Sequence, residues 1–298
     1  MLHFSEIGHA RNNEAHHGDG NYYDANRNLM VVCDGVSSQN GSGKIAAKAF
    51  ADTFDDKGSL TETVEKLIDS GKHQSTIVIA LIRENLLEVC AVGDSRAYLI
   101  RGGEITQLTT DHSLYEGLRP HLPQGVDPRR QETHEIIAHF IKNPPSRELI
   151  AAIREQFFMD NKVRLFRACV MARILDKLGH AKHVETCIRE MKTYRGADPY
   201  SATFLGLVIA RGPSAITHLL GYMDSKSVAT VKKIPIKPKD EILACSDGFS
   251  NLFVDEKEIM TVIEGQETVI GQIQALFEEA KSRGIKDDLT LLLGRIAD

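Results

Sequence analysis

The sequence predicts an α+β protein in which a sandwich core is interrupted by a helical insertion. Short apolar runs typical of buried strands lie towards both ends of the chain, as at residues 29–33 and 241–245. The middle of the chain is instead rich in helix formers and poor in strand patterns. One layered core split by an insertion explains this order better than three serial domains do.

Apolar spacing in the first third predicts one strand, two helices and then four further strands. The first strand, at residues 29–33, ends at Asp34 and Gly35. The helices are expected at residues 44–54 and 60–68. The later strands are expected at residues 76–82, 86–92, 97–100 and 105–108, with a hairpin turn between the last two.

The last third returns to strands. These are expected at residues 228–236, 241–245 and 289–296, with two amphipathic helices at residues 255–263 and 267–281. Residues 1–114 and 213–298 should therefore form one discontinuous core.

Residues 115–212 are predicted to form the helical insertion. Ser146 is expected to cap one of its helices, and an apolar stripe over residues 163–178 indicates another. Basic residues between 164 and 189 suit a solvated helix face, with a docking surface for an acidic or phosphorylated partner as the alternative. His180 and His183 could share a helix face, but without further ligands they are interpreted as surface or cap positions.

The bulk composition is that of an ordinary globular protein, with 42% hydrophobic and 26% charged residues among 298. A formal net charge of −5 argues against a nucleic-acid or anionic-membrane partner. No apolar run is long enough to span a bilayer, and the first residues lack a signal-peptide pattern. The five cysteines are odd in number and widely spaced, which favours reduced thiols and a cytoplasmic location.

Three aspartates stand at predicted strand ends. Asp34 and Asp247 each follow an apolar strand, and Asp287 shortly precedes one. Carboxylates that converge there repel one another unless a cation lies between them, and oxygen ligands suit Mg²⁺ or Mn²⁺. The alternative is that each aspartate is a turn former beside glycine.

Five segments resemble those of the 2C-type, metal-dependent serine/threonine phosphatases, particularly the compact bacterial members. The clearest is VGDSRAY at residues 92–98, and SDG at residues 246–248 is the next. The remaining segments are residues 31–38, 108–114 and 286–290, and all five stand in the order of the family. The resemblance implies a four-layer α-β-β-α sandwich of two antiparallel sheets, with the insertion in the place of a small flap.

The resemblance also implies a site with two Mn²⁺ or Mg²⁺ ions and a weaker third. Asp34 would bridge two ions, and the Gly35 carbonyl would bind the second. Asp247 and Asp287 would complete the first ion's ligands, and Asp94 would help to hold the third. Glu14 would serve the second ion through water.

Arg11 resembles the arginine that holds the substrate phosphate, a role that suits a guanidinium group. A solvated loop residue is the alternative for Arg11. The implied reaction is hydrolysis of phosphoserine or phosphothreonine in a protein substrate, by a water that bridges the metal ions. Arg96 is expected to pair with a carboxylate in a structural role.

One departure from the family pattern weakens the expected second metal site. Ala15 stands where the family's first motif ends in an acid, and the motif is one residue short. His16 or His17 would be a poorer substitute for a carboxylate. The alternative function is therefore a catalytically weakened regulator that binds a protein partner through the insertion. A third reading keeps the chemistry but takes a small phosphoester as substrate.

Overall fold

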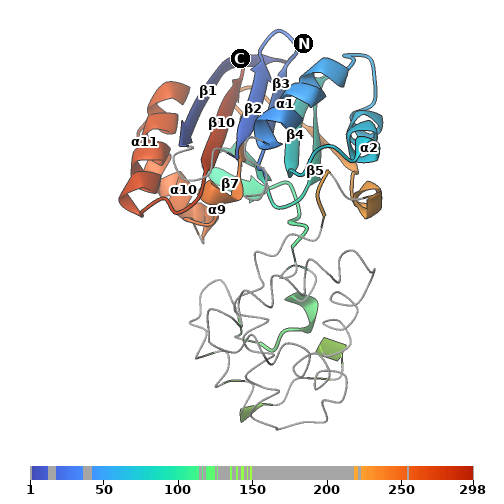
Figure 1. Ribbon diagram of the computed structural model, residues 1–298. Helices are drawn as coiled ribbons and strands as arrows, with labels where there is room; N and C mark the ends of the chain where they lie inside the picture. Colours follow the sequence, from blue (N-terminus) through green and yellow to red (C-terminus); the bar gives the residue numbers. More distant parts are fainter. Residues whose placement is uncertain are drawn as a thin grey trace. The chain divides into compact units, whose positions relative to one another are not determined.

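A computed structural model describes residues 2–12, 18–35, 42–113, 218–220, 223–253 and 255–297, together with scattered residues between 116 and 149. The chain divides into two compact units, Met1–His112 with Ile216–Asp298, and Ser113–Ala215. The first unit contains two five-stranded sheets (Figure 1). The helix predicted at residues 163–178 lies outside the described residues, as do His180 and His183.

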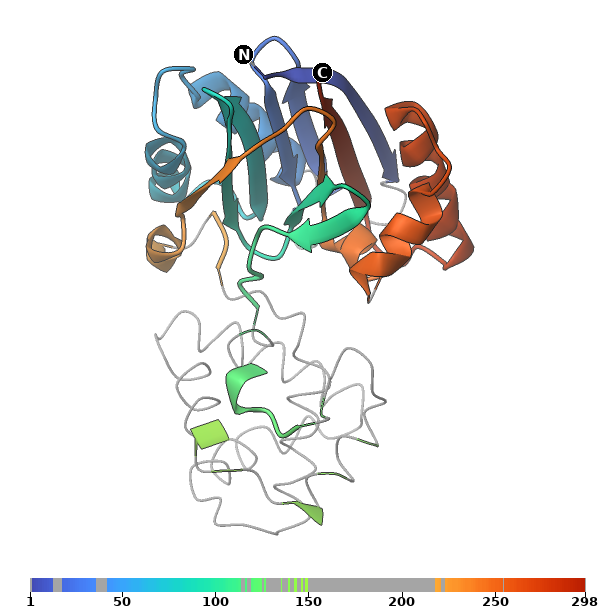
Figure 2. The same cartoon turned by 180° about the vertical axis from the view of Figure 1, so that it is seen from behind.

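Sheet A is antiparallel, with the strand order β1-β10-β9-β6-β7. Its strands are β1 (Phe4–Asn12), β6 (Arg96–Arg101), β7 (Glu104–Gln107), β9 (Glu241–Cys245) and β10 (Leu289–Ile296). The central strand β9 is buried along its whole length, as its continuous apolar sequence predicts. Figure 2 shows the β6–β7 hairpin from the opposite side, in green.

Sheet B is also antiparallel, with the order β2-β3-β4-β5-β8. Its strands are β2 (Gly20–Asp24), β3 (Leu29–Cys33), β4 (Ile77–Arg83), β5 (Leu86–Val92) and β8 (Val231–Pro235). The edge strand β8 carries exposed Lys232 and Lys233. Lysines on an edge strand disfavour pairing with a second chain.

Helices cover the outer face of each sheet (Figure 1). They are α1 (Ser42–Thr53), α2 (Leu60–Ser70), α9 (Asp247–Ser250), α10 (Glu256–Ile263) and α11 (Val269–Ser282). The side chains of Ser59, Asp255 and Thr268 cap α2, α10 and α11 by accepting a backbone N–H of the first turn. Two short 3₁₀ helices are η1 (Arg119–His121) and η3 (Met223–Ser227).

Three apolar layers hold the core together. One lies between sheet B and α1 with α2, around Phe50 and Ile79. A second lies between the two sheets, around Val32 and Leu292. The third lies between sheet A and α9 to α11, around Phe249. This arrangement confirms the predicted four-layer α-β-β-α sandwich.

The strands β1 and β2 are absent from the sequence prediction. Both lie at a sheet edge and are mostly half-buried or exposed, so neither has a continuous apolar run. The predicted cap at Ser146 is present, because its hydroxyl accepts a hydrogen bond of 3.1 Å from the Leu149 amide. Within the described residues, no helix has the length and apolar character that a membrane span requires.

Candidate active site

The register of sheet B brings Asp19 to the side of Asp34. β2 pairs with β3 so that Gly20 lies opposite Cys33, and the same register places the residue before Gly20 beside Asp34. The Asp34 backbone is fixed from the other side, where its N–H donates to Thr76 Oγ1 (3.1 Å) and its carbonyl accepts from the Thr76 N–H (2.8 Å). One end of sheet B therefore presents two carboxylates.

The register of sheet A gathers a second group at the ends of its strands. β6 pairs with β9 so that Arg96 lies opposite Cys245, which brings Asp94 and Asp247 to the same end. The hydroxyls of Thr76 and Ser95 are 2.6 Å apart and link this end of sheet A to the end of sheet B that carries Asp34.

Electrostatic interactions show that these carboxylates share one environment. Burial raises the pKa of Asp34 well above its usual value, and the charges of Asp247, Asp19 and Asp94 raise it further. Burial likewise raises the pKa of Asp94, with Asp247 adding to the effect. Burial raises the pKa of Asp247, and the charge of Asp287 adds to the effect. The strand-end aspartates predicted from the sequence thus lie close enough to disfavour one another's charge.

Asp19 is the acid that sequence reasoning missed. It is fully buried, and burial raises its pKa to about 6, although the hydroxyls of Ser246 and Thr290 and the Asp34 carboxyl act in the opposite direction. Asp19 provides a carboxylate beside Asp34 that the sequence analysis did not consider, while the weaker second metal site predicted from Ala15 stays a prediction. A hairpin signal, a strand at residues 20–24 paired with the strand at 29–33, would have revealed Asp19.

Two glycines allow the site to close. A Cβ on Gly35 would clash with the Ser42 hydroxyl and the Gly18 carbonyl. A Cβ on Gly248 would overlap the Asp288 carbonyl. Glycine at both positions therefore lets the strand ends approach more closely than any side chain would permit.

The other predicted site residues have separate outcomes. Arg11 is exposed at the end of β1, where it pairs with Thr290 in the register of β10. Thr290 also lies near Asp19, so Arg11 belongs to the same end of sheet A. Asp287 is exposed, and its Oδ1 accepts the N–H of Asp288 (2.8 Å). Glu14, His16 and His17 lie outside the described residues.

The donor set fits hard divalent cations. Its side chains are carboxylates, and Asp94 Oδ1 is buried with no hydrogen-bond partner among the residues that the structure describes. A divalent cation would neutralise the charges that otherwise raise these pKa values. Within the described ranges, no three His, Cys, Asp or Glu side chains are already placed to hold an ion together. The cluster is thus gathered by the fold, while its closure around an ion is a proposal.

Comparisons with known proteins agree with this architecture. The protein phosphatase 2C family model matches residues 22–117. The catalytic domain of the phosphatase PstP, solved with two manganese ions, is 18% identical over 100% of both chains, with a TM-score of 0.57. The serine/threonine phosphatase Stp1 of Staphylococcus aureus is 17% identical over 100% of this chain and 96% of its own, with a TM-score of 0.53.

The chain is thus similar to the protein phosphatase 2C family over residues 22–117, and its fold is similar to that of bacterial phosphatases of known structure. A curated relative, the serine/threonine phosphatase stp of Listeria monocytogenes, is 23% identical over 230 residues. The matched segment covers 77% of this chain and 59% of the Listeria protein.

In the sandwich core, a buried ion pair fixes the segment that carries Asp94. The Arg96 guanidinium binds both oxygens of Asp111, with Nε to Oδ1 at 2.9 Å and Nη2 to Oδ2 at 2.6 Å. Both side chains are nearly buried, at 11% and 10% exposure. Gln107 also donates to Asp111, at 3.1 Å. The structural pairing predicted for Arg96 is confirmed.

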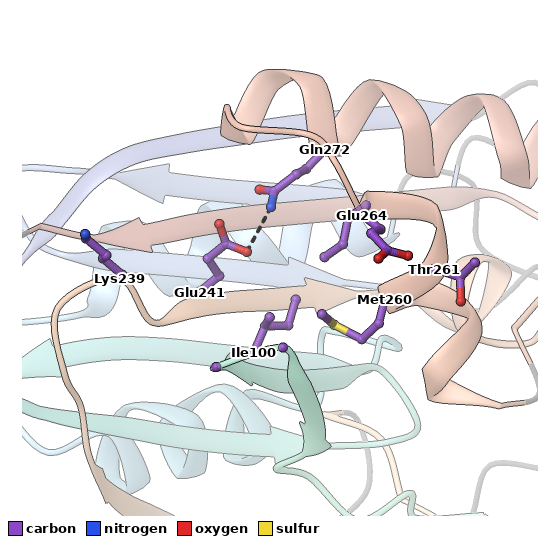
Figure 3. A pocket seen from close by; sticks show the side chains of 10 residues that line it. Ile100, Lys239, Glu241, Met260, Thr261, Glu264 and Gln272 are labelled. Carbon is purple, nitrogen blue, oxygen red and sulfur yellow. Dashed lines mark hydrogen bonds between the residues drawn. The ribbon is translucent and has the colours of Figure 1, made fainter.

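A pocket of about 420 Å³ lies at the other end of sheet A (Figure 3). Its wall includes Gly102, which follows β6, whereas Asp94 precedes β6. Ile100 and Met260 provide apolar surface, and Glu241 is held there by Gln272 at 3.1 Å. The pocket is therefore separate from the carboxylate cluster of the sandwich core.

Proposed function

We propose that this chain hydrolyses phosphoserine and phosphothreonine in proteins, with Mn²⁺ or Mg²⁺ bound at its carboxylate cluster. The observation that carries the proposal is the convergence of Asp34, Asp94 and Asp247 at one end of the sandwich, where Asp247 raises the pKa of both Asp34 and Asp94. Carboxylates that are partly or fully withdrawn from solvent and disfavour one another's charge form a cluster that divalent cations would stabilise. The names of the relatives support a serine/threonine phosphatase.

The proposed ligands have the following roles. Asp34 is central and would bridge two ions, helped by the Gly35 carbonyl. Asp247 and Asp287 would complete the first site, and Asp94 would hold a weaker third ion. Glu14 would serve the second ion. Asp19, beside Asp34, adds one further acid to this set.

Arg11 would bind the phosphoryl oxygens of the substrate. It is exposed at the end of β1 that lies next to the carboxylate cluster. A guanidinium group offers paired donors that match two oxygens of a phosphate, and its positive charge offsets theirs. Bound ions would supply Lewis-acid polarisation of the phosphoryl group and lower the pKa of a bound water.

The cysteines of the core support a route without a covalent intermediate. Cys33, Cys90 and Cys245 are buried. Burial raises the pKa of Cys90 and of Cys245 to about 12. The nucleophilic form of cysteine is the thiolate, which such a pKa makes rare at neutral pH.

Turnover of p-nitrophenyl phosphate with Mn²⁺ tests the proposal. Asp34→Ala is expected to lower kcat by at least about a hundredfold, because it removes the central carboxylate of the cluster. Asp56→Ala is the matched control, since Asp56 pairs with Arg27 on the surface and is 62% exposed. Wild-type turnover by Asp34→Ala would refute the mechanism.

Substrate class is tested by comparing phosphopeptides with small phosphate esters. A higher kcat/KM for phosphopeptides supports protein substrates, and the reverse supports a small phosphoester. Tight phosphopeptide binding with no turnover at any Mn²⁺ concentration would instead support the regulator. A partner on the insertion and a cytoplasmic location stay predictions.

A further inference from the structure

The turn that carries Asp94 lies between β5 and β6, beyond the pairing of either strand. It begins at Gly93, whose φ of +106° is a conformation that glycine adopts readily. A Cβ at Gly93 would meet the Thr76 side chain at 2.5 Å. The position of Asp94 therefore depends on what holds the Gly93 backbone.

His112 holds that backbone through two hydrogen bonds, one from its backbone amide and one to its ring. The backbone N–H of His112 donates to the Gly93 carbonyl at 2.8 Å. In return, the Gly93 N–H donates to His112 Nδ1 at 3.0 Å. Because a backbone amide can only donate, Nδ1 must be unprotonated, and a neutral ring carries its proton on Nε2.

Neighbouring groups support a neutral, fixed imidazole. The His218 ring lies edge-on to the His112 ring, with centroids 5.4 Å apart and an interplanar angle of 70°. Burial, together with the nearby His218, lowers the pKa of His112 to about 4, against the opposing effect of Asp111. Asp111 is itself engaged by Arg96, so the residue before His112 is anchored to β6.

We propose that His112 is a positioning residue that holds the Gly93 turn so that Asp94 can bind its metal ion. The inference rests on the proposed function, in which Asp94 serves a weaker ion than Asp34 does. His112 acts through the Gly93 backbone and does not itself contact the ion. Groups that orient a ligand in this way commonly change metal affinity by about 10- to 100-fold.

Two substitutions separate this role from simple packing. His112→Asn keeps an acceptor, because asparagine Oδ1 is bonded to Cγ as histidine Nδ1 is. His112→Leu fills a similar volume but leaves the Gly93 N–H without its acceptor. If the His112 ring matters only for packing, His112→Leu should preserve Mn²⁺ binding better than His112→Asn. If Nδ1 positions the Gly93 turn, His112→Asn should preserve it better.

Mn²⁺ binding to the full chain, measured by calorimetry and by electron paramagnetic resonance, provides the readout. Wild type is expected to show a tight class of sites and a weaker class. His112→Leu should weaken the weaker class about 10- to 100-fold and leave the tight class unchanged, while His112→Asn should keep both. Equal weak-class affinity in wild type and His112→Leu, or equal losses in the two variants, would overturn the proposal.

A measurement on the wild-type protein covers the case in which His112→Leu does not fold. In ¹⁵N-histidine NMR spectra, His112 Nδ1 should have the shift of an unprotonated acceptor and a scalar coupling to the Gly93 amide proton. A protonated Nδ1 would overturn the inference. Failure of the proposed function would look different, since wild type would then lack Mn²⁺-dependent turnover although the His112–Gly93 coupling was present.

Discussion

Replacing Asp19 by asparagine is expected to stabilise the metal-free protein at neutral pH. Asp19 is fully buried beside Asp34, and burial raises its pKa from 3.8 to about 6. An ionised Asp19 is therefore disfavoured in the folded state without metal. Asparagine keeps an acceptor for the hydroxyls of Ser246 and Thr290 but carries no charge.

The size and sign of the effect follow from proton linkage. Raising the pKa of Asp19 from 3.8 to about 6 corresponds to about 3 kcal/mol of unfolding free energy above pH 6. Between these pKa values the folded state binds more protons than the unfolded state, so wild-type stability falls as the pH rises. The advantage of Asp19→Asn should thus be about 3 kcal/mol at pH 7.5, or about 6–12 °C in Tm, and vanish towards pH 4.

Thermal unfolding of EDTA-treated protein, followed by circular dichroism from pH 4 to pH 8, measures this difference. Asp56→Asn is the control, because its 62% exposed carboxylate should change stability by less than about 0.5 kcal/mol. With saturating Mn²⁺, wild type should become the more stable of the two proteins, since Asp19→Asn has lost a carboxylate beside the ions. The reasoning would be refuted if Asp19→Asn were no more stable than wild type without metal. It would also be refuted if the difference in Tm between the two proteins did not change with pH.

Three further predictions concern the same core. Mn²⁺ at a hundredfold excess over its Kd should stabilise wild type by about 2.7 kcal/mol, seen as a rise in Tm that EDTA abolishes. Asp111→Ala removes the carboxylate that pairs with the nearly buried Arg96, so urea unfolding should show a loss of about 3–5 kcal/mol in the free energy of unfolding. Glu258→Ala is the control, because Glu258 and its partner Arg283 are 41% and 28% exposed, and it should cost less than about 1 kcal/mol. Gly248→Ala should cost about 1–3 kcal/mol and lower turnover, because its Cβ would meet the Asp288 carbonyl; unchanged turnover would show that this contact does not shape the site.

Buried strands were predictable because both of their faces are covered. Residues 29–33 and 241–245 are apolar throughout or nearly so, and both are buried from end to end. The polar residue that follows each strand must then lie at the edge of the core. Asp34 and Asp247 could therefore be named as site residues from the amino-acid pattern alone, and the family motifs added Asp94.

The edge strands were not predictable in the same way. β1 and β2 are mostly half-buried or exposed, and their polar positions resemble those of loops. Asp19 lies between two glycines at the start of β2, where its local sequence indicates a turn. Its burial depends on the pairing of Gly20 with Cys33, which is a property of the sheet and not of the segment.

The sequence by itself determined the order of strands and helices, the buried central strands and the family to which the acidic motifs point. Only the tertiary structure decided that Asp19 joins the cluster and that His112 holds the Gly93 turn. The physical reason is that local patterning reports how each segment meets the core, whereas a pKa or a hydrogen bond between distant residues depends on strand register. Register is fixed by the packing of whole sheets, and a shift of one residue would move Asp19 away from Asp34.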